Sequence, residues 1–244
     1  VLVRNFTDLG FSEEDQSRWK SMSDSPHGII LVTGPTGSGK TTTLYSTLKQ
    51  LATPAVNVCT IEDPIEMVEP AFNQMQVQTA IDLDFSQGVR ALMRQDPDII
   101  MIGEIRDLET AEVAIQAALT GHLVLSTLHT NDAPAAVTRM LDLGVPPYLI
   151  SATLLGVMAQ RLVRVLCPSC KEARPATAED NAMWDRLVAP WKANRPAQFH
   201  HPVGCLDCRM TGYRGRIGLY EILTLSPDMK QLLSENAEIA SSTV

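Results

Sequence analysis

The sequence predicts an α/β fold with a parallel central sheet and a small, separate cysteine module. Three observations lead to this prediction. Strand-like and helix-like segments alternate through residues 12–150, which is the pattern of an α/β domain. A glycine-rich loop at residues 34–41 stands between one predicted strand and the next predicted helix. Two Cys-x-x-Cys pairs follow the alternating region, within residues 160–220.

The predicted strands are short runs of β-branched and apolar residues. Continuous apolar runs are expected of parallel strands that helices cover on both faces. Because short lengths favour strand over helix for such runs, we assign strands at residues 28–33, 55–62, 98–102 and 122–130.

The predicted helices are bounded by capping residues. Ser12, Asp84 and Asp132 stand at N-cap positions, and Gly121 and Gly144 stand where helices are expected to end. Apolar residues recur at helical spacing between these boundaries. The predicted helices cover residues 12–22, 40–51, 84–95, 108–120 and 132–144.

The pattern changes after Pro146 and Pro147. Residues 148–166 form a long apolar run, which we interpret as a helix or a helix pair. A short helix is predicted near Met229–Leu233.

The charge of the chain is uneven. Net charge is −8 at pH 7, but residues 161–220 carry ten basic and five acidic residues, which leaves the remainder at −13. An acidic body argues against a broad nucleic-acid footprint. The basic segment suits an acidic partner or anionic lipid, or contacts the acidic body itself. No apolar run reaches the length of a membrane span, and the first residues lack a signal-peptide pattern.

The glycine-rich loop fits the pattern G-x-x-x-x-G-K-[ST] for binding a nucleoside triphosphate such as ATP. Glycines let backbone N–H groups close around phosphate oxygens, Lys40 neutralises the β and γ charge, and the Thr41 hydroxyl ligates Mg²⁺. The helix that starts there directs its positive dipole end at the anion. The predicted nucleotide-binding residues are Gly34, Pro35, Thr36, Gly37, Ser38, Gly39, Lys40, Thr41 and Thr42.

Acidic residues follow two of the predicted strands. Glu62, Asp63 and Glu66 lie in "TIEDPIE", and Glu104 ends "DIIMIGE". The carboxyl ends of parallel strands converge on the ligand, so these acids can hold metal-bound water or take a proton from an attacking water. We expect Gly103 to let the backbone approach the phosphates. Two alternatives stay open: an exposed acidic loop, and an edge acid paired with Arg106.

Two histidines flank the last predicted strand of the core. His122 and His129 are seven residues apart, so in one continuous strand they point to opposite faces. At most one of them is expected to face the nucleotide unless the strand ends before His129. The alternative is that each satisfies a local hydrogen bond.

The four paired cysteines have the composition of a metal site. Four thiolates give a closed, tetrahedral Zn²⁺ site, which is structural rather than catalytic. The insert between the pairs, residues 171–204, contains Trp184 and Trp191. Disulfides and a redox pair are the alternatives, and the fifth cysteine, Cys59, is expected in the core. The predicted ligands are Cys167, Cys170, Cys205 and Cys208.

Taken together, the motifs resemble those of the secretion ATPase superfamily. The chain carries, in the family's order, "GPTGSGKTTTLY", "TIEDPIE", "RQDPDIIMIGEIRDLETAEVAIQAALTGHLVLSTLHTND" and "QRLVRVLCPSC". It most resembles the general secretion pathway protein E group of type II systems, and its relatives the type IV pilus extension ATPases. The resemblance implies a RecA-like P-loop NTPase core with a parallel-rich central sheet, and ATP hydrolysis coupled to pseudopilus assembly and protein export, or to pilus extension.

The resemblance also implies roles for individual residues. Glu66 falls on the usual general base, Asp63 on a second acid near Mg²⁺, and Glu104 on the Mg²⁺-associated glutamate. His129 falls on the residue that senses the γ-phosphate, and His122 opens the same motif. Three further positions match family arginines, one of which acts across a subunit boundary: Arg90, Arg94 and Arg106.

The family's architecture implies partners and boundaries for this chain. Full-length members form homo-hexamers in the cytoplasm, peripherally associated with the inner membrane, and work with a platform protein and a cytoplasmic docking protein. We therefore expect a linker from a missing N-terminal domain at residues 1–25 and the ATPase core at 26–159. The metal module is expected at 160–220 and a truncated C-terminal segment at 221–244.

Two functions of other classes remain as alternatives at this point. P-loop cores with zinc modules also translocate nucleic acid, although the acidic body and the absence of an aromatic-rich basic groove disfavour this. A nucleotide-dependent scaffold without hydrolysis is the other alternative, and the complete set of acids disfavours it.

Overall fold

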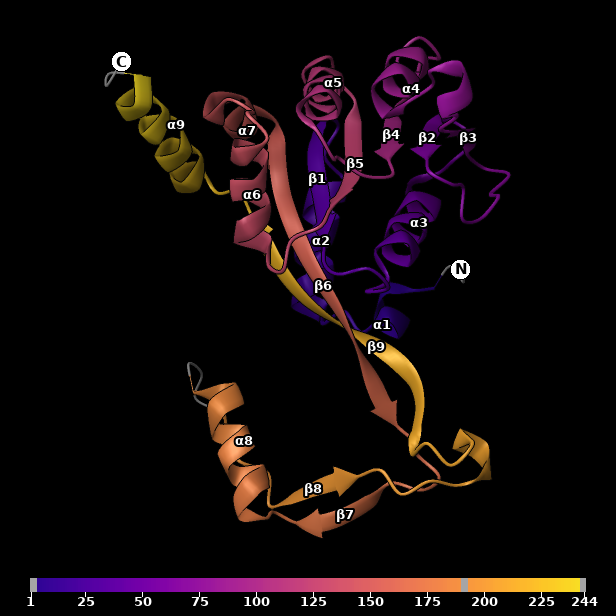
Figure 1. Cartoon of the computed structure of the whole chain (residues 1–244), viewed down its shortest axis with the longest axis vertical. Coiled ribbons are helices and arrows are strands. Elements are labelled where there is room, and N and C mark those ends of the chain that lie inside the picture. The colour runs from indigo at the N-terminus through magenta and orange to yellow at the C-terminus, as the bar shows by residue number, and fades with distance from the viewer. Residues whose placement is uncertain (1–3, 190–192, 242–244) are drawn as a thin grey trace. The chain divides into compact units, whose positions relative to one another are not determined.

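The computed structural model describes residues 4–189 and 193–241, with side chains described as far as residue 234. The chain divides into two compact units (Figure 1). The larger unit contains the residues up to Leu162 and from Gly218 onward, and the smaller contains Val163–Ile217. Two strands, β6 (Leu154–Leu166) and β9 (Tyr213–Thr224), each contribute residues to both units.

A seven-stranded sheet forms the centre of the larger unit, in the order β3-β2-β4-β5-β1-β6-β9. Strand β1 pairs in parallel with β5 and β6, β2 with β3 and β4, and β4 with β5. Every residue of β1, β2, β4 and β5 is buried, so the prediction of parallel strands covered on both faces is confirmed. Their bounds are β1 (Gly28–Thr33), β2 (Val58–Glu62), β3 (Asn73–Gln76), β4 (Ile99–Ile102) and β5 (Leu123–Leu128).

Helices pack on both faces of this sheet (Figure 1), and the strands alternate their side chains between them. Ile29 and Leu31 of β1 belong to one apolar cluster, and Ile30 and Val32 belong to the other. The second cluster includes side chains of α1 (Phe6–Leu9), α2 (Glu13–Ser23) and α3 (Lys40–Leu51). The first cluster includes those of α4 (Phe85–Leu92), α5 (Leu108–Leu119), α6 (Ala133–Asp142) and α7 (Pro147–Thr153).

The predicted N-caps form as expected. The Ser12 side chain accepts a hydrogen bond from the backbone N–H of Asp15, whose carboxylate accepts from the N–H of Ser12 in return. Asp84 and Asp132 each accept at 2.8 Å from the backbone N–H three residues on. Local capping chemistry therefore sets the start of three helices, and each start is readable from the sequence.

The prediction of a helix or helix pair over residues 148–166 is wrong for most of that run. Helix α7 ends at Thr153, and residues 154–166 form β6 between β1 and β9. The first part of β6, residues 154–160, is largely buried among neighbouring strands, so its sequence lacks the alternation that would separate it from a buried helix. At Gly156 an added Cβ would lie 2.5 Å from the carbonyl oxygen of Leu223, so this strand requires glycine where β9 passes.

The described part of the smaller unit contains a two-stranded antiparallel sheet, one α-helix and a short 3₁₀ helix at Leu206–Cys208. Strand β7 (Glu172–Pro175) pairs with β8 (Gln198–His201), and α8 (Ala178–Val188) lies in the insert between them. Trp184 of α8 packs edge-on against Phe199 of β8, with 6.0 Å between ring centroids. The other tryptophan predicted for this insert, Trp191, lies outside the described residues.

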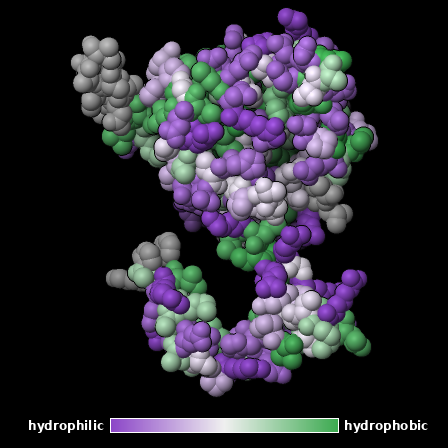
Figure 2. Space-filling model, in the orientation of Figure 1, coloured by the Kyte–Doolittle hydropathy of each residue, from purple (hydrophilic) through white to green (hydrophobic). Residues whose placement is uncertain are grey.

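The described helices include none that is both long enough and apolar enough to cross a membrane. The face of the larger unit shown in Figure 2 is mainly hydrophilic, with small apolar patches between the polar side chains. The last helix is α9 (Pro227–Ser241), which extends the short helix predicted near Met229–Leu233.

Candidate active site and metal centre

The glycine-rich loop connects β1 to α3, as predicted. Gly34 and Gly39 have φ values of +139° and +89°, in the region that favours glycine. A Cβ at Gly34 would lie 2.3 Å from the carbonyl oxygen of Gln160, and a Cβ at Gly39 would lie 2.9 Å from the Gln160 side chain. The loop therefore needs glycine both for its backbone conformation and for its close approach to β6.

Lys40 begins α3 and is buried beneath this loop. Its Nζ donates to the carbonyl oxygens of Gly34 (2.8 Å) and Pro35 (3.2 Å). Burial lowers the pKa of Lys40, and the nearby charges of Glu104 and Glu66 offset part of that effect. The buried Ser38 Oγ finds no hydrogen-bond partner among the described residues. A buried ammonium and an unpaired hydroxyl at a helix N-terminus are what a phosphate group would satisfy.

Acidic side chains gather beside the loop at the carboxyl ends of the parallel strands. Glu66 accepts a hydrogen bond from the hydroxyl of Thr41 at 3.2 Å. Glu104 follows β4 and lies 3.2 Å from the Nε2 of His129, which follows β5. Asp63 lies 4.0 Å from the guanidinium of Arg106, which also bonds to Glu104. The structure thus brings together six residues that the sequence singled out: Thr41, Asp63, Glu66, Glu104, Arg106 and His129.

The charge state of Glu104 follows from its partners. Burial raises the pKa of this carboxyl, but the hydrogen bond and charge of Arg106, followed by those of His129, outweigh burial and leave the pKa below its ordinary value. The Glu104 hydrogen bond likewise raises the pKa of Arg106. Glu104 is therefore ionised, and its carboxylate has the chemistry of an oxygen ligand for Mg²⁺ or its waters.

Three other residues that the sequence pointed to do not take part in these contacts. His122 precedes β5 at the end opposite to His129, and its Nδ1 lies 2.8 Å from the carbonyl oxygen of Ala117. Glu62 ends β2 but is buried, and its carboxylate accepts hydrogen bonds from Tyr45 and Thr60. A Cβ at Gly103 would lie 3.3 Å from both the Ile61 carbonyl oxygen and the Phe85 ring, so close packing also favours glycine at this position.

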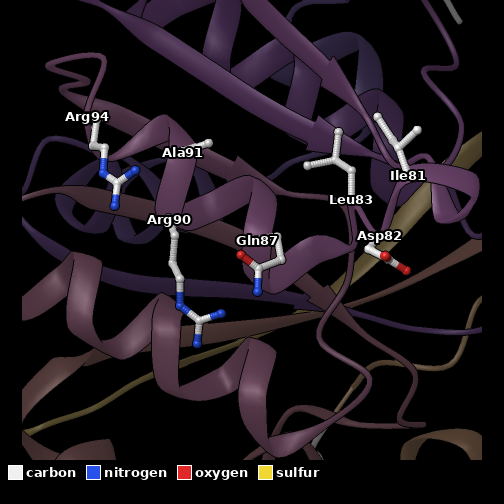
Figure 3. Close-up of a pocket in the computed structure, with 7 residues that line it drawn as sticks. All are labelled: Ile81, Asp82, Leu83, Gln87, Arg90, Ala91 and Arg94. Carbon is white, nitrogen blue, oxygen red and sulfur yellow. The ribbon is translucent and has the colours of Figure 1, made fainter.

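Of the predicted arginines, Arg90 lies on α4, and Arg94 lies two residues after the end of that helix. Arg90 pairs with Glu109 at 3.0 Å, whereas the structure shows no ion pair to Arg94 among the residues it describes. Both line an open hollow of about 510 Å³ (Figure 3). The remaining side chains of the hollow come from α4 and the segment before it: Ile81, Asp82, Leu83, Gln87 and Ala91.

Sequence reasoning missed Gln160 of β6. Its side chain supports the glycine-rich loop at residues 34–41, which we call the phosphate loop from here on. Its Nε2 donates to the carbonyl oxygen of Ser38, and its Oε1 accepts from the hydroxyl of Thr43, both at 2.9 Å. The side chain is only 1% exposed. A single amide inside the apolar run "LLGVMAQ" was the available signal, because a buried polar side chain needs partners.

The four predicted metal ligands meet in the smaller unit. Their Sγ atoms all lie within 4.8 Å of one another, and three of the pairs are 3.8–3.9 Å apart. Sulfur atoms at about 2.3 Å from a tetrahedral zinc ion are about 3.8 Å apart. The arrangement fits that ion and places the sulfurs too far apart for a disulfide, in which they are about 2.05 Å apart.

Backbone groups also prepare this centre for a cation. Burial raises the pKa of the Cys208 thiol, but the N–H groups of Cys205 and Gly212, together with the neighbouring thiols, outweigh burial and bring the pKa to about 6. Burial and the same group of thiols raise the pKa of Cys170 to about 11. A thiolate is the form that binds metal. The four cysteines form a candidate metal site.

A phosphate loop between a parallel strand and a helix, with acids at the neighbouring strand ends, defines a P-loop nucleotide-binding protein. The chain belongs to the type II/IV secretion system protein family, whose model matches residues 1–243.

Two curated relatives come from a type IV pilus system and from a type II secretion system. The chain is 64% identical over 239 residues to the type IV pilus assembly ATPase TfpB of Acinetobacter baylyi, covering 98% of this chain and 40% of the relative. It is 51% identical over 235 residues to the type II secretion system protein E of Pseudomonas aeruginosa, covering 96% of this chain and 46% of the relative. The chain thus spans less than half the length of these two relatives.

Solved structures of related motors share the fold. The pilus retraction motor PilT with bound ADP is 30% identical and matches with a TM-score of 0.67 over the whole of this chain and 60% of its own. The ATPase DotB of Legionella pneumophila is 25% identical, with a TM-score of 0.65 over 95% of this chain and 53% of its own.

Proposed function

We propose that the full-length protein is a cytoplasmic ATPase motor, peripherally associated with the inner membrane, that powers pseudopilus assembly and protein export by a type II secretion system. The observation that carries this proposal is the group of Thr41, Glu66, Glu104 and His129 beside the phosphate loop. Family membership and the relatives named as ATPases support it.

The residues divide the work of hydrolysis. Lys40, Ser38 and the loop's N–H groups bind and orient the phosphates. The donor set of Thr41, Asp63 and Glu104 fits Mg²⁺, which when bound neutralises charge on the β- and γ-phosphates. Glu66, held beside Thr41, takes the proton of the attacking water. His129 is positioned by Glu104 to contact the γ-phosphate.

The remaining parts of the proposal concern assembly. We propose that the full-length protein forms a homo-hexamer, in which one of Arg90, Arg94 and Arg106 acts across a subunit boundary. The centre formed by Cys167, Cys170, Cys205 and Cys208 holds structural Zn²⁺. A platform protein of the inner membrane and a cytoplasmic docking protein receive the work, and the basic segment at residues 161–220 contacts anionic lipid.

The 64% identity to a pilus assembly ATPase favours type IV pilus extension as a second candidate. Both candidates are tested by restoring the full-length gene to a deletion strain of the source bacterium, with Lys40→Ala as the inactive variant and the exposed Lys49→Ala as its control. Recovery of export supports the first candidate, and recovery of pili supports the second. Failure of both, with hydrolysis stimulated by single-stranded DNA, would instead support a nucleic-acid motor.

The role of Gln160 makes a separate prediction. Replacing it with leucine leaves the Ser38 carbonyl and the Thr43 hydroxyl without their partner, and an unpaired buried group costs about 1–3 kcal/mol. We expect the Kd for ADP, measured with a fluorescent analogue, to rise roughly tenfold. The control is Gln116→Leu, at an exposed position on α5. An unchanged Kd would show that the loop keeps its shape without Gln160.

A further inference from the structure

A buried hydrogen-bond network joins α3 to the end of β2. The Tyr45 hydroxyl lies 2.7 and 2.9 Å from the two carboxylate oxygens of Glu62. The Thr60 hydroxyl donates to the same carboxylate at 2.6 Å, and Gln74 Nε2 lies 2.9 Å from the Tyr45 oxygen. Tyr45, Thr60 and Glu62 are all buried, and Gln74 is partly buried.

The network has enough hydrogen-bond donors to supply each of its acceptor oxygens. The single hydroxyl proton of Tyr45 serves Glu62, and one N–H of the Gln74 amide serves the carbonyl oxygen of Met67 at 2.9 Å. The other N–H of Gln74 serves the Tyr45 oxygen. Burial, followed by the hydrogen bond to Glu62, raises the pKa of Tyr45, so this hydroxyl keeps its proton and remains a donor.

Glu62 is therefore occupied within the protein. Glu62 is only 4% exposed, and both of its carboxylate oxygens accept hydrogen bonds from neighbouring residues. A carboxylate that binds Mg²⁺ or activates water must present an oxygen to the ligand. The neighbouring Asp63 and Glu66 are exposed and meet that condition.

The network holds in place the segment that carries Glu66, residues 63–69, which we call the Glu66 segment. Glu62 lies immediately before this segment, and Gln74 binds its far side by accepting from the N–H of Glu69 at 2.7 Å and donating to the Met67 carbonyl. Tyr45 lies on α3 five residues after Lys40. The Tyr45 ring also packs against Phe72, with 5.7 Å between centroids. One hydroxyl thus connects the phosphate-loop helix to both ends of the Glu66 segment.

We infer that Tyr45, Glu62 and Gln74 form a positioning brace that holds Glu66 against Thr41, and that Glu62 acts through this brace without binding the metal. The inference rests on the proposed function, in which Glu66 accepts the proton of the attacking water. Displacement of a reacting group by about 1 Å can cost on the order of 100-fold in rate. Loosening the brace therefore affects turnover more than nucleotide binding.

The test uses Tyr45→Phe and Glu62→Gln in the full-length protein. Tyr45→Phe removes one oxygen and keeps the ring that packs on Phe72. We expect each variant to lower kcat roughly 10- to 100-fold, beyond any change in Tm, while KM for ATP and the Mg²⁺ concentration at half-maximal rate stay close to wild type. The matched controls are Tyr148→Phe and Glu112→Gln, both exposed in the described structure.

The outcomes separate the brace from its alternatives. Wild-type kcat in Tyr45→Phe, or a lower Tm with unchanged kcat, would overturn the inference because the network would then serve the fold alone. A raised Mg²⁺ requirement confined to Glu62→Gln would make Glu62 a metal ligand and also overturn it. Absence of turnover in the wild-type protein would instead contradict the proposed function.

Discussion

Replacing Glu66 with glutamine is expected to lower kcat for ATP hydrolysis about 10²–10⁴-fold, the usual contribution of a general base. The Glu66 carboxylate lies 3.2 Å from the Thr41 hydroxyl, and in the proposed mechanism it takes the proton of a water that attacks the γ-phosphate. Glutamine keeps the shape and the hydrogen-bonding oxygen but has no basic carboxylate. KM for ATP is expected to change little, because the phosphate loop and Lys40 are untouched.

The measurement is steady-state phosphate release by the full-length protein over a range of ATP concentrations. Glu112→Gln, the same chemical change at an exposed position of α5, serves as the control and is expected to match wild type. Normal turnover in Glu66→Gln would remove Glu66 from the role of base.

Replacing Cys167 with serine is expected to unfold the smaller unit. A structural zinc site supplies roughly 10–16 kcal/mol of apparent folding free energy, and this unit has little core of its own. Among its described residues, α8 has no buried side chain. The variant is expected to lose its bound metal and to be cut by a protease within residues 171–204, and chelation of the wild-type protein is expected to do the same.

Cys59 provides the matched control for that experiment. It is fully buried in β2 of the larger unit and is not one of the four clustered cysteines. Cys59→Ala is therefore expected to keep one metal ion per chain and the wild-type proteolysis pattern. Metal content by mass spectrometry and limited proteolysis measure both effects. A metal-free Cys167→Ser protein with the wild-type cleavage pattern would contradict a folding role for the centre.

Features with a local cause were predictable from the sequence. The phosphate loop needs glycine, lysine and threonine at fixed spacing, so its position between β1 and α3 followed from the motif. The caps at Ser12, Asp84 and Asp132 depend on residues three positions away. The cysteine cluster was predictable because four thiols in two pairs have few other uses in such a chain.

Features decided by distant contacts were not predictable. Glu62 and Glu66 lie four residues apart in one acidic segment, but they have different partners. Glu62 accepts a hydrogen bond from the buried Tyr45 hydroxyl, whereas Glu66 accepts one from Thr41 beside the phosphate loop. Gln160 meets the loop from 122 residues further along the chain. Strand β6 could not be distinguished from a helix over residues 154–160, because burial among neighbouring strands removes the alternation there.

The dependence of hydrolysis on Mg²⁺ tests the division of labour between the two acids most directly. The measurement compares kcat and the Mg²⁺ concentration at half-maximal rate for full-length wild type, Glu66→Gln and Glu104→Gln. We predict that Glu66→Gln lowers kcat at an unchanged Mg²⁺ requirement, because Glu66 acts on water. Glu104→Gln is predicted to raise the Mg²⁺ requirement at least tenfold, or about 1.4 kcal/mol. The reverse pattern, or wild-type behaviour in both variants, would contradict the account.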